Sequence, residues 1–337
     1  MSGVATITIN PHRCTGVRLR RLNGGNLGPK MAPPFKSFQT DFAMLDIPLT
    51  RLHDAPLSNP GMRLVDIHHI FGNWEADADD PRNYYFDQTD EYIRRIIANG
   101  SQIVYRLGTS IEFCEPHYYA FPPDDFEKWT DICMHIIRHY NEGWKSGYNW
   151  NIPYWEIWNE PDDSRCFAPE SSKMWNGTAE EFCRLYEVAA PRIKRRFPQL
   201  KIGGAAFWKL DEKTGRGEED FIDKFLKHCR DRQIPLDFFS WHCYASPTHP
   251  FRIIDEPVRA RKLLDSYGFE QTELHLNEWR YVESWDPLYM RSGEHGLNSL
   301  RAAVHAAATV IGWQDTPLDQ AMFYTVGEMM LPWGLWY

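Results

Sequence analysis

Apolar and polar positions follow two different periods along most of this chain, and segments with one period alternate with segments that have the other. Short runs of aromatic and β-branched residues predict buried strands, and longer segments with an apolar residue every three or four positions predict amphipathic helices. From residue 88 onward the predicted helices are Gln88–Ala98, Asp124–Asn141, Ala179–Phe197, Glu219–Arg230, Glu256–Tyr267 and Leu297–Ile311. The predicted strands are Gln102–Leu107, Pro153–Trp158, Lys201–Phe207, Leu236–His242, Glu273–Asn277 and Gln320–Val326. Helices and strands therefore alternate over this part of the chain.

The N-terminal part is less regular. Two more strands are expected there, Gly16–Leu22 and Pro48–Leu52, with a loosely helical segment at Phe35–Leu45. Strands that alternate with helices form parallel βαβ units. Eight such strands predict a closed (β/α)8 barrel, the TIM-barrel fold, and no G-x-G-x-x-G turn follows the first strand to support an open dinucleotide-binding sheet. No repeat or linker marks a boundary, so residues 1–337 are predicted to form a single barrel domain.

The end of the chain does not fit a complete barrel. The sequence stops at Tyr337, a few residues after the predicted eighth strand, where the closing helix would be expected. We therefore expect the sequence to be truncated at its C-terminus. Trp333, Leu335 and Trp336 would then lie uncovered, and because exposed apolar patches promote association, we expect self-association through this end.

The charge of the chain limits its partners and its location. The formal net charge is −9, which argues against nucleic acid or an anionic membrane as the main partner. No apolar run approaches the roughly 20 residues of a membrane span, and residues 1–10 lack the charged and apolar segments of a secretion signal. The chain as given is therefore predicted to be cytoplasmic. A secreted or periplasmic location stays open for a protein whose N-terminus has been trimmed.

Cysteines and aromatic residues add two constraints. The seven cysteines are odd in number and include no C-x-x-C pair, so reduced thiols are expected rather than a disulfide framework or a zinc site. Aromatic residues make up 15% of the chain, including 14 tryptophans. Most are expected in the core, but flat aromatic faces also bind sugar rings. The tryptophans that we expect at a cleft are Trp74, Trp279, Trp313 and Trp333.

Two glutamates occupy equivalent places at the ends of predicted strands. Glu160 follows the strand Pro153–Trp158 and precedes Pro161, which cannot continue a ladder. Glu278 follows the strand Glu273–Asn277 far downstream. Because the carboxyl ends of barrel strands meet at one mouth, both carboxylates are expected there. A pair of carboxyl groups that flank the scissile bond is what glycoside hydrolysis requires, one as the acid and the other as nucleophile or base.

The two carboxyl groups need different surroundings. The acid must keep its proton near neutral pH, which burial or a neighbouring negative charge favours, and the nucleophile must stay ionised beside hydrogen-bond donors or a cation. Arg51, Arg106, His242 and Tyr244 lie at predicted strand ends and have suitable side chains. The distance between the two carboxyl groups decides the type of mechanism. A retaining enzyme has them about 5–5.5 Å apart, and an inverting enzyme about 6.5–9.5 Å apart.

Several motifs together resemble one family of sugar-cleaving enzymes. They are G-V-R-L-R-R-L-N-G-G-N-L-G-P at 16–29, Arg51-x-His53, Y-R-L-G at 105–108, W-x-I-W-N-E-P at 155–161, W-H-C-Y at 241–244, N-E-W at 277–279 and W-G-L at 333–335. The chain resembles glycoside hydrolase family 39, which includes β-xylosidases and α-L-iduronidases and belongs to a clan of retaining glycosidases. The resemblance implies that Glu160 is the acid/base and Glu278 the nucleophile. It also implies that Asn159 binds the sugar 2-hydroxyl and that His242 and Tyr244 orient the nucleophile or the sugar.

The resemblance extends to the wider site and has two departures. The substrate-binding residues that we expect from these motifs are Arg51, His53, Asn159, His242, Tyr244, Trp279 and Trp333. Family members usually carry a β-sandwich after the barrel, which we do not expect within residues 1–337. The residue before the nucleophile is usually Thr or similarly small, whereas this chain has Asn277, which would alter the local hydrogen bonds.

Three functions from different classes remain open at this stage. The leading one is a retaining β-xylosidase-like hydrolase that cleaves β-linked pentosides without metal or cofactor. Within the same class, the alternative is a related exo- or endo-glycosidase that acts on arabinosides, uronides or a polysaccharide. The second is a barrel that only binds carbohydrate. The third is a metal-dependent hydrolase that uses His53 and His242, with Asp54 as the nearest further ligand. Glu156 is expected to be structural, and Glu112, Glu115 and Glu283 are expected to be rim or surface charges.

Overall fold

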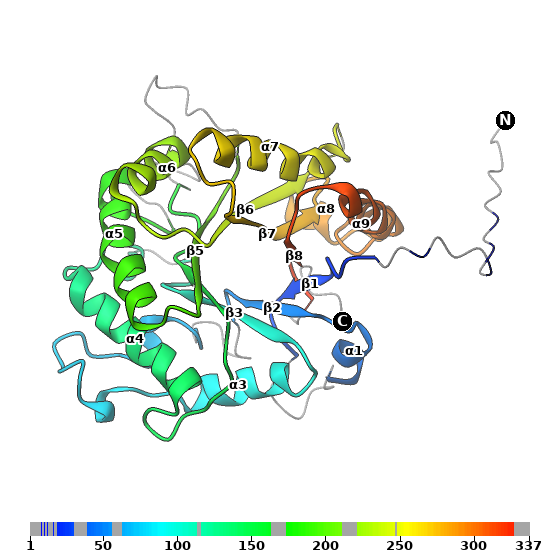
Figure 1. Ribbon diagram of the computed structural model, residues 1–337. Coiled ribbons are helices and arrows are strands. Elements are labelled where there is room, and N and C mark those ends of the chain that lie inside the picture. The colour runs from blue at the N-terminus through cyan, green and yellow to red at the C-terminus, as the bar shows by residue number, and fades with distance from the viewer. Residues whose placement is uncertain are drawn as a thin grey trace.

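The structure is a computed structural model that describes residues 8, 10, 12, 16, 19–29, 39–55, 63–112, 116–162, 173–210, 221–246 and 248–326. Eight parallel strands close into a barrel in the order in which they occur along the chain (Figure 1). The strands are β1 (Gly24–Asn26), β2 (Leu49–Leu52), β3 (Gln102–Leu107), β4 (Tyr154–Ile157), β5 (Lys201–Phe207), β6 (Phe238–Ala245), β7 (Glu273–Tyr281) and β8 (Gln320–Phe323). The predicted (β/α)8 fold is confirmed.

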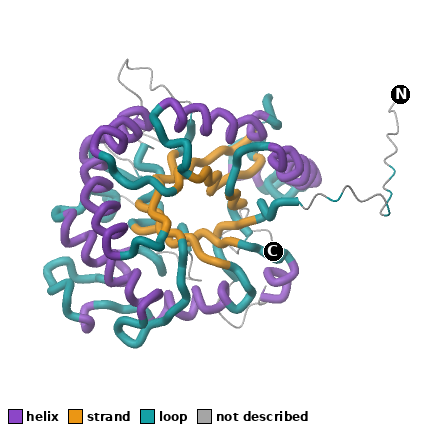
Figure 2. The backbone as a smooth tube through the Cα atoms, viewed as in Figure 1, coloured by secondary structure: helices purple, strands orange, loops and turns teal. Residues whose placement is uncertain are grey.

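Helices surround the ring of strands on its outer side, as the colouring by secondary structure makes clear (Figure 2). The helices are α1 (Gln39–Met44), α2 (Ile67–Ile70), α3 (Asp87–Ile97), α4 (Phe126–Glu142), α5 (Ala179–Arg196), α6 (Phe221–Arg232), α7 (Arg252–Ser266), α8 (Pro287–Met290) and α9 (Leu300–Gly312). Helix α5 is capped at its N-terminus by Thr178, which forms a reciprocal capping box with Glu181. None of the helices in the described ranges is long and apolar enough to cross a membrane.

The main apolar core lies between the barrel and the helices, whereas the inside of the barrel holds a small apolar cluster of Leu49, Val104 and Met322 and a set of buried polar side chains. Trp155 and Ile157 on β4 are buried in the outer core with residues of the surrounding helices. Between them in sequence, Glu156 is fully buried and bonds to Arg51. This alternation follows from the period of two in a strand, which sends successive side chains to opposite faces. Polar side chains on alternate positions therefore converge inside the barrel.

The position of the first strand differs from the prediction. Residues 19–23 are not in a strand, and β1 is instead formed by Gly24–Asn26, where Gly25 pairs with Thr50 of β2 and with Phe323 of β8. A Cβ atom on Gly24 would lie 2.5 Å from the carbonyl oxygen of Ala321. Close approach of neighbouring strands therefore requires glycine here, although glycine has a low strand propensity. The predicted features at 327–337, including Trp333 and the question of a closing helix, lie outside the described residues.

Two strands extend further than predicted. Strand β6 runs to Ala245 and β7 runs to Tyr281, so that Glu278 lies within β7 rather than after it. The pairing of β6 with β7 shifts register between Trp241 and His242, and the pairing of β7 with β8 shifts between Leu276 and Trp279. These irregularities lie next to the residues that the sequence analysis identified as functional, which is where such features are over-represented in sheets.

Candidate active site

Glu160 is positioned by an irregular turn that ends β4. Trp158 and Glu160 both have left-handed backbone conformations, with φ of +72° and +44°. Such conformations cost roughly 1–3 kcal/mol for a residue other than glycine and occur frequently at functional sites. The Glu160 amide donates to the carbonyl of Ala206 at 3.0 Å, and the Trp158 indole donates to the carbonyl of Met174 at 2.8 Å. The turn is thus tied to the barrel on one side and to the outer layer on the other.

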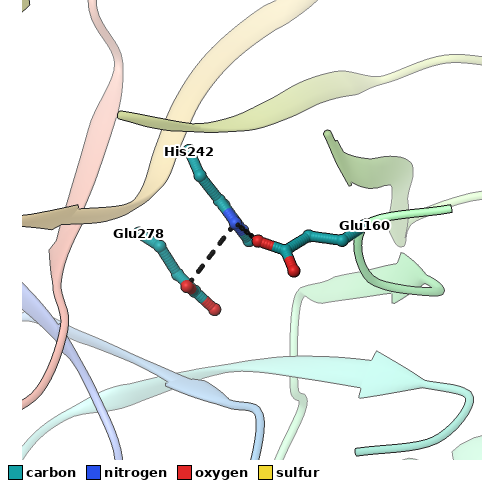
Figure 3. A group of neighbouring side chains, drawn as sticks. All are labelled: Glu160, His242 and Glu278. Carbon is teal, nitrogen blue, oxygen red and sulfur yellow. Dashed lines mark hydrogen bonds and ion pairs between the residues drawn. The ribbon is translucent and has the colours of Figure 1, made fainter. Parts of the chain in front are cut away.

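Glu160 and Glu278 converge on His242, as Figure 3 shows. The Nδ1 atom of His242 lies 2.6 Å from Oε1 of Glu160 and 3.5 Å from Oε2 of Glu278. One oxygen of each glutamate and one nitrogen of the histidine all lie within 4.8 Å of one another. The three side chains are almost completely buried. The two carboxylates are therefore close enough to act on a single bond of a ligand.

Two donors bind the carboxylate of Glu278. Arg51 Nη1 donates to Oε1 at 2.8 Å, and the hydroxyl of Tyr244 donates to Oε2 at 2.7 Å. Burial raises the pKa of Glu278, and the nearby Glu160 raises it further. His242, Arg51 and the hydrogen bond from Tyr244 oppose this shift, but the pKa of Glu278 still lies above its ordinary value. Burial and the neighbouring Glu278 also raise the pKa of Tyr244 well above its ordinary value, so this residue stays a donor.

Arg51 connects the bottom of the site to its mouth. Its Nε donates to Glu156 at 2.6 Å, and its Nη2 donates to the side-chain oxygen of Asn159 at 2.6 Å. Burial alone would lower the pKa of Arg51, but Glu156 and Glu278 reverse this and raise it, so the guanidinium is charged. The predicted structural role of Glu156 fits these contacts, because the side chain holds Arg51 from below.

The unusual Asn277 also binds to Glu156. Its side-chain amide donates to Oε1 of Glu156, and the hydroxyl of Ser240 donates to the same oxygen at 2.7 Å. The side-chain amide of Asn26 in turn donates to the backbone carbonyl of Asn277 at 2.8 Å. The hydrogen bonds that Asn277 makes therefore run down into the barrel and away from the two glutamates.

His53 lies beside the nucleophile candidate but is held by a second arginine. Arg106 Nε donates to His53 Nδ1 at 3.2 Å, and His53 Nε2 lies 3.9 Å from Oε1 of Glu278. Burial, with the charges of Arg51 and Arg106, lowers the pKa of His53 well below its ordinary value, so the ring is neutral. Arg106 itself pairs with the buried Asp66. The structure thus brings Arg51, His53, Asn159, His242 and Tyr244 together around the two glutamates.

The predicted role of Trp279 in lining the cleft is wrong. Its side chain is 2% exposed and packs edge-on against Trp313 and Phe323, with ring centroids 4.8 and 5.0 Å apart. Because Glu278 points into the barrel, strand alternation sends Trp279 to the outer core. Trp313 is likewise completely buried in that core.

Other aromatic residues, which the sequence analysis missed, lie beside Tyr244 instead. The rings of Trp208 and Trp285 lie 5.8 and 5.4 Å from the Tyr244 ring, and the ring of Tyr324 lies 6.4 Å from it. Trp285 is 54% exposed, in the loop after β7. The position of Trp208 one residue after the strand Lys201–Phe207 was a usable signal for its location at the mouth, but nothing in the local sequence marks Trp285.

The cluster of Glu160, His242 and Glu278 also has the spacing of a metal site. Of the ligands expected for a metal-dependent hydrolase, this group contains His242 but not His53 or Asp54. The Arg51 guanidinium and the Tyr244 hydroxyl already bind both oxygens of Glu278. A positively charged guanidinium at 2.8 Å disfavours a divalent cation on the same carboxylate.

Comparisons with known proteins agree with this geometry. The sequence model of Glycosyl hydrolases family 39 matches residues 58–310. A beta-xylosidase of Geobacillus stearothermophilus is 26% identical over 215 residues, which cover 58% of this chain and 37% of the relative. A glucosidase structure from Croceicoccus marinus has a TM-score of 0.75 and 26% identity, and the match covers 94% of this chain and 64% of the other. A monomeric beta-xylosidase from Caulobacter crescentus shares the fold at a TM-score of 0.65 and 16% identity, with 94% and 64% coverage.

Proposed function

The chain belongs to Glycosyl hydrolases family 39, and from this membership and the geometry of the site we propose that it is a retaining glycosidase that cleaves β-linked pentosides. In this proposal Glu160 is the acid/base and Glu278 is the nucleophile. The observation that carries it is the distance of at most 4.8 Å between oxygens of the two glutamates. A retaining mechanism needs carboxyl groups about 5–5.5 Å apart, whereas an inverting enzyme leaves room for a water with about 6.5–9.5 Å.

The reaction then proceeds in two displacements. An oxygen of Glu278 attacks the anomeric carbon and forms an ester, while the glycosidic bond breaks and its oxygen takes the proton of Glu160. Glu160, now a carboxylate, removes a proton from water, whose oxygen attacks the anomeric carbon. The ester to Glu278 breaks, and the sugar leaves with its original anomeric configuration.

The neighbours of the two glutamates suit these roles. Arg51 and Tyr244 hold Glu278 by its two oxygens and stabilise the ionised form that attacks. His242 shares a short hydrogen bond with Glu160, and when the proton of that bond lies on Glu160 the carboxyl group is ready to donate it. His53 is neutral and therefore does not compete with Arg51 as a cation beside the nucleophile.

The proposed substrate class is inferred from the side chains at the mouth of the barrel and from the names of similar proteins. Trp208 and Trp285 lie beside Tyr244, and flat aromatic faces suit the apolar face of a sugar ring. Asn159, which Arg51 holds through its side-chain oxygen, is our candidate for binding the 2-hydroxyl. The relative from Geobacillus stearothermophilus is called a beta-xylosidase, which favours a pentose. The similarity to a glucosidase structure makes a β-glucoside the second candidate substrate.

The proposed function is tested by stereochemistry on a panel of aryl glycosides. We expect turnover of the β-xyloside to exceed that of the α-arabinoside, β-glucoside and α-iduronide. Proton NMR should detect β-xylose as the first product, before mutarotation, and a chelator should leave the rate unchanged. First release of α-xylose would contradict the double displacement. Loss of activity with the chelator would favour the metal-dependent hydrolase. If no glycoside were turned over, the barrel that only binds carbohydrate would be the remaining hypothesis.

The acidic limb of the pH profile should depend on Tyr244. Its hydrogen bond opposes the increase in the pKa of Glu278, so Tyr244→Phe should raise that pKa further. Because the ionised carboxylate attacks, activity is lost as the pH falls through this pKa, and the acidic limb of kcat/KM should move to higher pH. A charge-assisted hydrogen bond of about 1.5 kcal/mol corresponds to a shift of roughly one pH unit.

A matched control for this variant exists at the other end of the barrel. The hydroxyl of Tyr154 donates to the carboxylate of Glu273 at 3.1 Å, at the beginning of β4 and β7. Tyr154→Phe therefore removes the same kind of contact without reaching the site, and its profile should match that of the unmodified protein. An unchanged acidic limb in Tyr244→Phe would show that Glu278 does not set this limb.

A further inference from the structure

A cavity of about 380 Å³ lies at the ends of β3 and β4, next to the turn that carries Glu160, and contains none of the residues that bind the two glutamates. It is bounded by α2, the loop before α4, and the ends of β3 and β4. We call it the rim cavity and define it by His68, Trp74, Tyr118, Phe121, Trp129 and Trp158. Its volume is within the range of about 300–1,000 Å³ that small-molecule sites occupy. Its walls are mainly aromatic rings.

The aromatic loop on one side of the rim cavity is held by Glu112. The carboxylate of this residue accepts from the backbone amides of Tyr118, Tyr119 and Ala120, at distances of 2.7 to 3.2 Å. Of the two locations expected for Glu112, rim or surface, the surface is excluded, because the side chain is 4% exposed. A buried carboxylate that binds successive backbone amides fixes the loop conformation, because separating them would leave the charge unpaired.

Further contacts hold the rings at the mouth of the cavity. His68 stacks on Tyr119 with ring centroids 3.4 Å apart and an angle of 2° between the planes. Lys128 Nζ lies 5.7 Å from the centroid of the Trp74 ring and donates to the carbonyl of Ala76 at 2.8 Å. Although these contacts hold the loop, Tyr118 and Phe121 remain 69% and 51% exposed. The aromatic surface is thus both fixed and accessible, which lowers the entropic cost of binding a ligand.

The polar groups of the rim cavity suit a ligand that carries hydroxyl groups. Thr109 supplies a hydroxyl, Asp124 a carboxylate and His68 an imidazole among the lining residues. Burial lowers the pKa of His68 to about 4, so this ring is neutral at neutral pH and offers a hydrogen bond without a charge. A sugar ring combines an apolar face with hydroxyls around its edge, and such a ligand matches aromatic walls with a few convergent polar groups.

We propose that the rim cavity is a second carbohydrate-binding site, which holds a sugar residue outside the catalytic centre. The inference rests on the proposed function, because it takes the same class of ligand. Trp158 connects the two places: its ring lines the cavity, and its backbone leads directly into Asn159 and Glu160. A polymer or oligosaccharide held there is kept near the catalytic mouth, which raises its local concentration at the site.

The test counts binding sites by isothermal titration calorimetry with xylotetraose. Glu278→Gln is used as the background so that the ligand is not consumed. We expect two sites per chain in this background, and only one after a further Trp74→Ala or Tyr118→Ala change. Tyr85→Ala is the control, because Tyr85 is 66% exposed but does not line the cavity; this variant should keep both sites. In the otherwise unmodified protein, Tyr118→Ala should leave kcat/KM for a small aryl xyloside within about twofold.

Each other outcome has a defined meaning. A single site that neither Trp74→Ala nor Tyr118→Ala affects overturns the inference and leaves the proposed function intact. Binding of p-nitrophenol, with no second site for xylotetraose, also overturns it, because the cavity would then recognise an aromatic group. Tyr118 is exposed, so its replacement does not threaten the fold, and thermal melts check this. Failure of the proposed function is detected separately, as an absence of turnover on the glycoside panel.

Discussion

Glu278→Ala should abolish turnover of β-xylosides, with a loss on the order of 10⁴- to 10⁶-fold in kcat. The change removes the group that forms the bond to the anomeric carbon, and Arg51 and Tyr244 cannot replace it because they are donors. The shorter side chain leaves space on the face of the sugar opposite to the leaving group. Azide should therefore restore activity on a substrate with a good leaving group, and the product should be the α-xylosyl azide, with inverted configuration.

Glu75→Ala is the control for this experiment, because Glu75 is an exposed glutamate outside the site and its loss should leave kcat unchanged. The product anomer is identified by NMR. Near-normal turnover by Glu278→Ala would place the chemistry elsewhere. Rescue by azide with retained configuration would show that the roles of the two glutamates are exchanged.

Glu160→Ala should have an effect that depends on the leaving group. Removal of the general acid should lower kcat/KM by about 10²–10⁴-fold for xylobiose, whose leaving sugar needs a proton. For 2,4-dinitrophenyl β-xyloside the first step needs little proton transfer, so the glycosyl-enzyme should still form and accumulate. Azide should then attack this intermediate from the vacated side and give the β-xylosyl azide.

The measurement for Glu160→Ala compares kcat/KM across aryl xylosides of graded leaving-group pKa. A steep dependence in the variant and a shallow one in the unmodified protein is the expected result. An equal loss for every substrate would contradict the acid/base assignment. It would instead indicate that the variant disturbs the turn at Trp158 or the position of His242, which near-ultraviolet circular dichroism would detect.

The barrel and the pair of glutamates could be predicted because their signals are local. Amphipathic helices and short apolar strands have distinct periods, and Glu160 lies two residues after the end of the predicted strand Pro153–Trp158 and directly before Pro161. The position of the first strand could not be predicted in this way. Its sequence is Gly24-Gly25-Asn26, and glycine is required by close contacts with β8 and Val326, which exist only in the folded barrel. No local propensity predicts such a strand.

The surroundings of the glutamates were only partly predictable for the same reason. Arg51, His53, His242 and Tyr244 lie at strand ends, so their convergence follows from the barrel. Trp279 was misassigned because the predicted seventh strand ended at Asn277, whereas β7 continues to Tyr281 and alternation turns the indole outward. Glu112 and Trp285 lie in loops, and their roles depend on backbone conformations that no residue pattern in those loops reveals.

The cross-strand contacts of Arg51 also have a consequence for how the chain folds. Arg51 on β2 binds Glu156 on β4, Glu278 on β7 and Asn26 on β1, and Glu156 in turn binds Ser240 on β6 and Asn277 on β7. A half-barrel of β5 to β8 would contain Glu278, Ser240 and Asn277 but neither Arg51, the cation that pairs with Glu278, nor Glu156. Leaving a buried charge without its partner costs about 3–5 kcal/mol. A folding intermediate with only these four strands docked is therefore disfavoured, so the two halves of the barrel should assemble in one cooperative step.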